Sequence, residues 1–240
     1  MAQPDPDPVR NNEASNHTPN LSPFAIHPSL NPRFTVSHAL FLQQNPTLSL
    51  SPASSRTNPV ILIRHLAAGA ILIHPPHHHQ HAPHPPPPPR VLLLRRAPTD
   101  SMPNLWEVPG GAIDLTDETL LSGIARELFE EASLTPSSIG PLVGPQNGQV
   151  FASRSGKLIA KFHFLAEVEG NGKDVPEVKC DPAEHSEAMW VEEEEVQAQW
   201  TRGMERELEF TTREQREVVL EGFRVWRELR EAAVKGEAEG

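Results

Sequence analysis

The chain reads Trp-Glu-Val-Pro-Gly-Gly over residues 106–111 and Arg-Glu-Leu-Phe-Glu-Glu over residues 126–131. A proline followed by two glycines predicts a turn whose backbone can approach a ligand closely. Thr116 or Asp117 then offers an N-cap, and the apolar spacing that follows predicts a helix to about Ala132. An apolar strand, a permissive turn and an acidic helix therefore succeed one another along the chain.

The acidic residues of this helix share one side. Glu127, Glu130 and Glu131 fall within an arc of roughly 100° on a regular helix. Like charges at this spacing repel by roughly a few tenths of a kcal/mol per pair, and a hard divalent cation bound by oxygen ligands removes that repulsion. Arg126 can reach Glu130 one turn later and hold it. A solvated acidic helix face is the alternative, but the arginine and the Gly-Gly turn favour a metal site that activates water.

The same residues resemble a known family motif, the Nudix box. The box is written Gly-x5-Glu-x7-Arg-Glu-U-x-Glu-Glu-x-Gly-U, with U a bulky aliphatic residue, and here it runs from Gly111 to Leu134. Six residues instead of five separate Gly111 from Glu118, and Ser133 stands where the family has glycine. A serine held in the left-handed conformation costs about 1–2 kcal/mol. The flanking segments 95–97, 104–111 and 185–191 extend the resemblance, which is greatest to fungal members.

This resemblance to the Nudix hydrolase family implies an α/β fold, an α/β/α sandwich with a mixed sheet. It also implies a pyrophosphohydrolase that cleaves the diphosphate linkage of a nucleoside diphosphate-type substrate with Mg²⁺ or Mn²⁺. The metal ligands implied by position are the carbonyl of Gly110 and the carboxylates of Glu127, Glu130 and Glu131. Arg126 would orient a box glutamate, and Glu118 would lie behind the ligands.

Some family members add a glutamate from a later loop as a metal ligand or general base. Glu187, just before Met189-Trp190-Val191, is the candidate, and an ordinary loop acid is the equal alternative. A second possible function is a Nudix-fold module that binds a nucleotide or a protein partner without turnover. The extra residue before Glu118 and Ser133 motivate it, whereas the intact acids oppose it. The sequence does not select a particular diphosphate substrate.

The rest of the chain divides into three parts. Residues 1–32 are rich in Pro, Asn, Ser and Asp, so we expect them to be disordered. Residues 33–58 predict a short strand or helix docked on the domain and ending near Pro46. Residues 59–236 are expected to form the Nudix domain, with strands over 60–74, 91–94, 149–153, 158–167 and 188–191 and a helix over 212–234. The His/Pro-rich stretch 75–89 is interpreted as a loop insertion rather than a zinc or nickel site.

The composition limits the partners. The 240 residues carry a formal net charge of -11, which disfavours duplex nucleic acid but not a small phosphorylated substrate bound through cations. Cys180 is the one cysteine, so no internal disulfide is possible. No apolar run is long enough for a membrane span, and the N-terminus resembles neither a signal nor a transit peptide. We therefore expect an intracellular, cytoplasmic protein that acts on a small phosphorylated substrate.

Overall fold

The computed structural model describes residues 23–45, 63–75, 87–153, 156–168 and 175–238. In chain order the elements are β1 (Ala25–Ile26), η1 (Pro32–Phe34), α1 (His38–Gln44), β2 (His65–His74), β3 (Arg90–Arg96), β4 (Trp106–Glu107), α2 (Leu120–Ala132), β5 (Pro136–Val143), β6 (Gln149–Ala152), β7 (Leu158–Val168), β8 (His185–Glu192), α3 (Glu193–Ala198), β9 (Trp200–Thr201), β10 (Arg206–Glu207) and α4 (Arg213–Ala238). Among these residues, no helix combines the length and apolar character that crossing a membrane requires.

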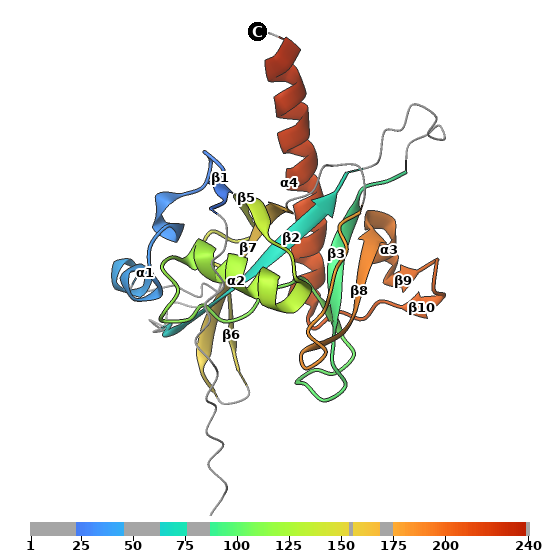
Figure 1. Cartoon of the computed structure of the whole chain (residues 1–240), viewed down its shortest axis with the longest axis horizontal. Helices are drawn as coiled ribbons and strands as arrows, with labels where there is room; N and C mark the ends of the chain where they lie inside the picture. Colours follow the sequence, from blue (N-terminus) through green and yellow to red (C-terminus); the bar gives the residue numbers. More distant parts are fainter. Residues whose placement is uncertain (1–22, 46–62, 76–86, 154–155, 169–174, 239–240) are drawn as a thin grey trace, which may run out of the picture.

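Eight strands form one mixed sheet, and β9 and β10 form a separate hairpin. The path through the large sheet is β1-β5-β7-β2-β3-β4, with β6 on β7 and β8 on β3. The central pair β2–β7 is parallel, as is β1–β5, and the other pairs are antiparallel. Helix α2 covers one face of the sheet and α4 the other (Figure 1). The α/β/α sandwich with a mixed sheet is therefore confirmed.

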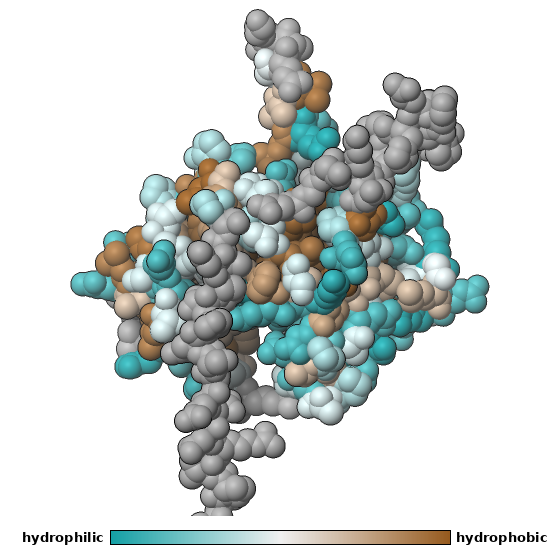
Figure 2. All heavy atoms as spheres, viewed as in Figure 1, coloured by the Kyte–Doolittle hydropathy of each residue, from teal (hydrophilic) through white to brown (hydrophobic). Residues whose placement is uncertain are grey.

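The strands alternate between two apolar cores, as the period of an extended chain requires. In β3, Leu92 and Leu94 pack in the core beneath α2, whereas Val91 and Leu93 pack in the core beneath α4. All four side chains are fully buried. This explains why the predicted strand was uniformly apolar. The far end of α4 projects beyond the sheet, and Figure 2 shows that hydrophobic residues continue onto it.

The N-terminal part of the described chain belongs to the core beneath α2. Phe34 and Phe41 are completely buried, with ring centroids 5.9 Å apart. The ring of Phe34 also lies 5.2 Å from Phe162 and 5.0 Å from Phe164, both in β7. Strand β1, which pairs with β5, lies before residue 32 and so within the segment that was expected to be disordered. Residues 1–22 and 46–62 lie outside the described residues.

Several predicted elements differ in their bounds. The acidic helix α2 begins after Thr119, not after Thr116 or Asp117, because Thr119 and Ser122 cap each other reciprocally. Strand β5 was not predicted, since its residues 136–143 include two prolines and a glycine. The hairpin of β6 and β7 is confirmed. Residues 76–86 of the His/Pro-rich stretch lie outside the described residues, and the flanking strands β2 and β3 pair antiparallel.

Candidate metal and catalytic site

The Pro-Gly-Gly turn runs along β2 at the edge of the candidate site. The N–H groups of Ala68 and Ala70 donate to the carbonyls of Gly111 and Pro109, at 2.9 Å and 2.8 Å. Gly110 between them has a φ of 142°, and a Cβ there would lie 2.2 Å from the carbonyl oxygen of Ala68. Only glycine fits so close an approach of two backbones. The turn is thereby fixed against the sheet, directly above α2.

This turn holds two of the box glutamates. The N–H of Gly110 donates to Glu131 Oε2 at 2.6 Å. At Gly111 a Cβ would lie 2.7 Å from Glu127 Oε2, so a side chain there would displace that carboxylate. The second glycine is therefore explained by the space that Glu127 occupies. The structure brings together Gly110, Glu127 and Glu131 as the box spacing predicted; the metal role of the Gly110 carbonyl stays a prediction.

Arg126 ties the acidic face of α2 to the loop before it. Its Nη1 donates to Glu127 and to Glu130, both at 2.9 Å, so the predicted reach to Glu130 is present. Its Nη2 donates to the carbonyl of Ala112 at 2.9 Å. Burial alone would lower the pKa of Arg126, but Asp117 and Glu127 outweigh that effect and raise it. Arg126 thus stays charged and fixes the positions of two box carboxylates.

The acid that supports Arg126 is Asp117 rather than Glu118. Asp117 is buried and accepts from Arg126 at 3.0 Å and 3.1 Å, whereas Glu118 is exposed. Gly123 makes room for it, since a Cβ there would lie 2.7 Å from Asp117 Oδ2. Counted from Gly111, Asp117 follows after five residues, which is the box spacing. The inserted residue therefore falls after the acid, and the assignment of Glu118 was wrong by one position.

Two of the box carboxylates are buried, and burial changes their acidity. Burial is the main cause that raises the pKa of Glu131 to about 9, assisted by the charges of Glu127 and Glu107 and opposed by the hydrogen bond from Gly110. Burial likewise raises the pKa of Glu127 to about 7, against the nearby charge of Arg126. Without a cation, these groups retain protons near neutral pH. A divalent ion would displace the protons and restore both carboxylates as ligands.

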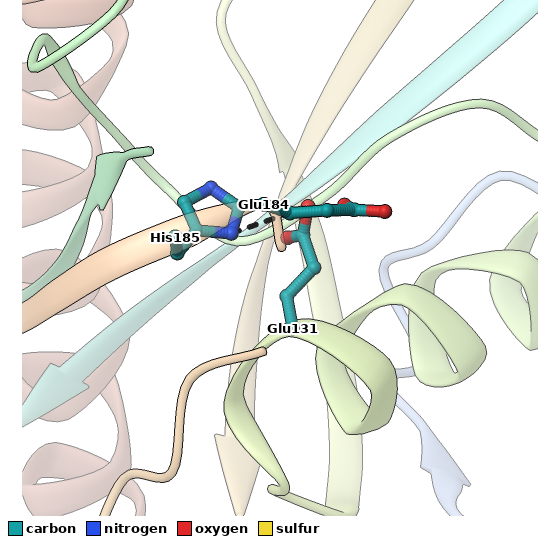
Figure 3. A group of neighbouring side chains, drawn as sticks. All are labelled: Glu131, Glu184 and His185. Carbon is teal, nitrogen blue, oxygen red and sulfur yellow. Dashed lines mark ion pairs between the residues drawn. The ribbon is translucent and has the colours of Figure 1, made fainter. Parts of the chain in front are cut away.

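A loop before β8 brings a further glutamate to Glu131. The loop is bound to the end of α2, because Lys179 N–H donates to Ala132 at 3.1 Å and Ser133 Oγ donates to the carbonyl of Lys179 at 3.2 Å. Glu184 follows in this loop. Oxygen atoms of Glu131 and Glu184 and a ring nitrogen of His185 all lie within 4.8 Å of one another (Figure 3). Glu184 lies just before the flanking segment 185–191 and was not among the predicted site residues.

Glu187 lies on another side of the sheet. It is opposite Arg95 in the β3–β8 pair, and its carboxylate forms ion pairs with Arg206 and, at 3.9 Å, with Arg95. Two residues later, Met189 packs in the core beneath α4, away from α2. The structure therefore does not place Glu187 in the cluster formed by Glu131 and Glu184. Its role as a general base stays a prediction.

Another buried carboxylate, that of Glu107, lies behind Glu131. Glu107 forms an ion pair with Arg96 and lies 3.4 Å from His185 Nε2. Burial would raise the pKa of Glu107, but hydrogen bonding to His185 and the charges of Lys161 and Arg96 outweigh it and lower that pKa. Glu107 is thus ionised and can accept hydrogen bonds. From the sequence it had been assigned only to the strand before the turn.

The donor set fits a divalent cation. Several carboxylate oxygens meet beside a backbone turn, and two of them belong to buried side chains whose pKa burial raises. Oxygen-rich sets of this kind suit Mg²⁺ and Mn²⁺. His185 Nδ1 is buried beside them and has no hydrogen-bond partner among the described residues. The residues that could hold a metal are Gly110, Glu127, Glu130, Glu131, Glu184 and His185.

Several solved structures are similar to the chain. The chain resembles the MutT protein from Methanosarcina mazei Go1, with 26% identity, 56% of this chain and 80% of that chain covered, and a TM-score of 0.40. For the Nudix hydrolase RenU from M. smegmatis the identity is 22%, the covered shares are 75% and 92%, and the TM-score is 0.44. For the NUDIX domain of Shewanella oneidensis NrtR, solved with ADP ribose, the identity is 18%, the match covers 80% of this chain and 99% of that chain, and the TM-score is 0.45. No curated protein sequence matches the chain.

The family model for the NUDIX domain matches residues 64–211. This range spans more than half of the chain and runs from the start of β2 to just before α4. It contains the Gly-Gly turn, the acidic helix and the Glu184 loop. The chain therefore belongs to the NUDIX family.

Proposed function

We propose that the chain hydrolyses the diphosphate linkage of a nucleoside diphosphate-type substrate with Mg²⁺ or Mn²⁺. The observation that carries the proposal is the meeting of Glu127 and Glu131 at the Gly110-Gly111 turn, where burial raises the pKa of both carboxyls. Glu130, also held by Arg126, would complete the ligands. When bound, the cation would polarise a phosphoryl oxygen and neutralise the charge that develops there.

The chain's own residues would perform the remaining tasks. Arg126 holds Glu127 and Glu130 in place, and Gly110 N–H holds Glu131. In the reaction, a water oxygen attacks one phosphorus, the anhydride P–O bond breaks, and the second phosphoryl group leaves with the bond's electrons. The water proton would pass to a carboxylate. Glu184 is our first candidate because its carboxylate is exposed beside Glu131, and Glu187 is the second.

The proposal is tested with a substrate panel. Modified nucleoside triphosphates, dinucleoside polyphosphates, ADP-ribose and coenzyme A are incubated with Mg²⁺ or Mn²⁺, and phosphorylated products are separated and quantified. Wild type is compared with Glu130→Gln and Glu131→Gln, and with Glu118→Gln as a control on the exposed loop. We expect both ligand variants to lose turnover and the control to keep it. Equal turnover in all four proteins would overturn the metal assignment.

The same panel separates the two general-base candidates. Loss of a general base slows a reaction by roughly 10²–10⁴-fold. We expect that loss for Glu184→Gln and a near wild-type rate for Glu187→Gln; the reverse pattern would assign the base to Glu187. Tight nucleotide binding in calorimetry without hydrolysis of any panel member would instead favour a binding module without turnover.

A further inference from the structure

His185 occupies a position between two buried carboxylates. Its side chain is 2% exposed, with Nε2 lying 3.4 Å from Glu107 Oε1 and Nδ1 lying 3.9 Å from Glu131 Oε1. Figure 3 shows the ring turned toward Glu131, with Glu184 beside it. The imidazole therefore connects the Arg96–Glu107 ion pair to the box glutamates, although neither the box motif nor the sequence analysis assigned it a role.

The two ring nitrogens have different surroundings. Glu107 is held in an ion pair by Arg96 and lies 3.4 Å from Nε2, so its carboxylate can accept a hydrogen bond from that nitrogen. In the neutral ring, Nδ1 then presents a lone pair toward Glu131 and has no hydrogen-bond partner among the described residues. A buried polar atom left without a partner is destabilising. A cation between Nδ1 and the carboxylates would provide the missing partner.

We propose that His185 Nδ1 is a nitrogen ligand of the metal that Glu131 binds, beside the carboxylate of Glu184. The inference rests on the metal-dependent function proposed above and adds one donor to it. Two ligands about 2.1 Å from one ion lie roughly 3–4 Å apart, which matches the 3.9 Å between Nδ1 and Glu131 Oε1. Glu107 accepts from the other ring nitrogen, as carboxylates commonly do behind metal-bound histidines.

A nitrogen ligand changes which metal the site prefers. Mg²⁺ selects oxygen donors, whereas first-row transition metals accept imidazole readily. The chain should therefore bind Mn²⁺ more tightly than Mg²⁺, and this preference should be larger than that of a site made only of carboxylates. The competing explanation is that His185 merely packs and hydrogen-bonds with Glu107. Glutamine separates the two explanations, because its amide can still reach Glu107 but has no atom at the position of Nδ1.

The test is pulsed EPR of the full chain loaded with less than one equivalent of Mn²⁺, which detects ¹⁴N bound directly to the ion. Wild type should show the nitrogen signal and His185→Gln should lose it, with Mn²⁺ affinity by calorimetry falling about 10–100-fold and Mg²⁺ affinity falling less. The His/Pro-rich stretch is another source of nitrogen. A matched control therefore replaces its five histidines by glutamine, and this variant should keep the signal. The five are His77, His78, His79, His81 and His84.

The possible failures are distinguishable. Stoichiometric Mn²⁺ binding without a nitrogen signal in the five-histidine variant would overturn the role of His185 and leave the proposed function standing. No Mn²⁺ binding at all would overturn both. If circular dichroism shows that His185→Gln does not fold, His185→Asn replaces it, because its amide oxygen occupies the position of Nδ1. That variant should bind Mn²⁺ without the nitrogen signal, and a retained signal would contradict the proposal.

Discussion

Replacing Glu131 by glutamine should make the metal-free protein less sensitive to pH. The folded chain raises the pKa of this carboxyl to about 9, mainly through burial, from an ordinary value of 4.5. Between these two values the folded state holds a proton that the unfolded state has lost. The free energy of unfolding therefore falls as pH rises through this window, by about 1.4 kcal/mol per pH unit for one proton. Glutamine cannot lose a proton, so this fall should disappear.

The effect of Glu131 is best isolated between about pH 7.5 and about pH 8.5. This interval lies above the pKa of Glu127, about 7, and below the pKa of Glu131, about 9. There Glu127 has largely lost its proton, and His163, whose pKa burial lowers to about 3, is neutral in both states. Over this unit of pH, wild type should lose on the order of 1 kcal/mol of stability and Glu131→Gln almost none. The glutamine oxygen can still accept from Gly110 N–H, so the turn should remain in place.

The assay is urea unfolding followed by tryptophan fluorescence, in EDTA and at constant ionic strength. Glu118→Gln is the control, because this exposed side chain should retain the wild-type slope. A repeat with saturating Mn²⁺ should flatten the wild-type slope, since the cation replaces the proton. If Glu131→Gln loses stability with pH as steeply as wild type, the carboxylate does not carry the buried proton and our electrostatic reasoning is wrong.

Three further substitutions test the architecture, two by urea unfolding and the third by thermal unfolding. Asp117→Ala removes one buried carboxylate from Arg126, which keeps Glu127 and Glu130, and should cost about 1–3 kcal/mol, whereas Glu118→Ala should change stability by less than about 0.5 kcal/mol; equal effects would contradict the one-position correction. Phe34→Ala leaves a cavity in the core beneath α2 and should cost about 3–5 kcal/mol. A cost below about 1 kcal/mol would show that the N-terminal segment is not needed for the stability of the domain. Ser133→Gly relieves a φ of 55° and should raise the thermal midpoint by about 2–4 °C; a lower midpoint would mean that the hydrogen bond to Lys179 outweighs the relief.

Local patterns predicted those parts of the fold that are determined locally. The acidic helix and its grouping of Glu127, Glu130 and Glu131 follow from helical period, and the sandwich follows from the family resemblance. Strand β5 was missed because two prolines and a glycine are poor strand formers, and its pairing with β7 overrides that preference.

The remaining site residues depend on contacts between distant parts of the chain. Glu184 and His185 reach Glu131 because their loop hydrogen-bonds to the end of α2, and nothing in their local sequence predicts that contact. Glu187 was named as a candidate from its place beside a strand, but strand alternation and the bulge near Arg95 direct it to the opposite side of the sheet. Asp117 differs: counting the box from Gly111 as well as from Arg126 would have identified it.

The aromatic contacts of Phe34 and Phe41 affect the folding of the chain during its synthesis as well as the stability of the folded domain. Phe162 follows Phe34 by roughly 130 residues, so at about 5–20 residues per second the ribosome completes the partner strand some 6–26 s later. During this interval the two phenyl rings have emerged without the β7 residues that bury them. The N-terminal segment therefore presents apolar surface to chaperones and to other nascent chains, and the domain closes only after most of its sequence has been synthesised.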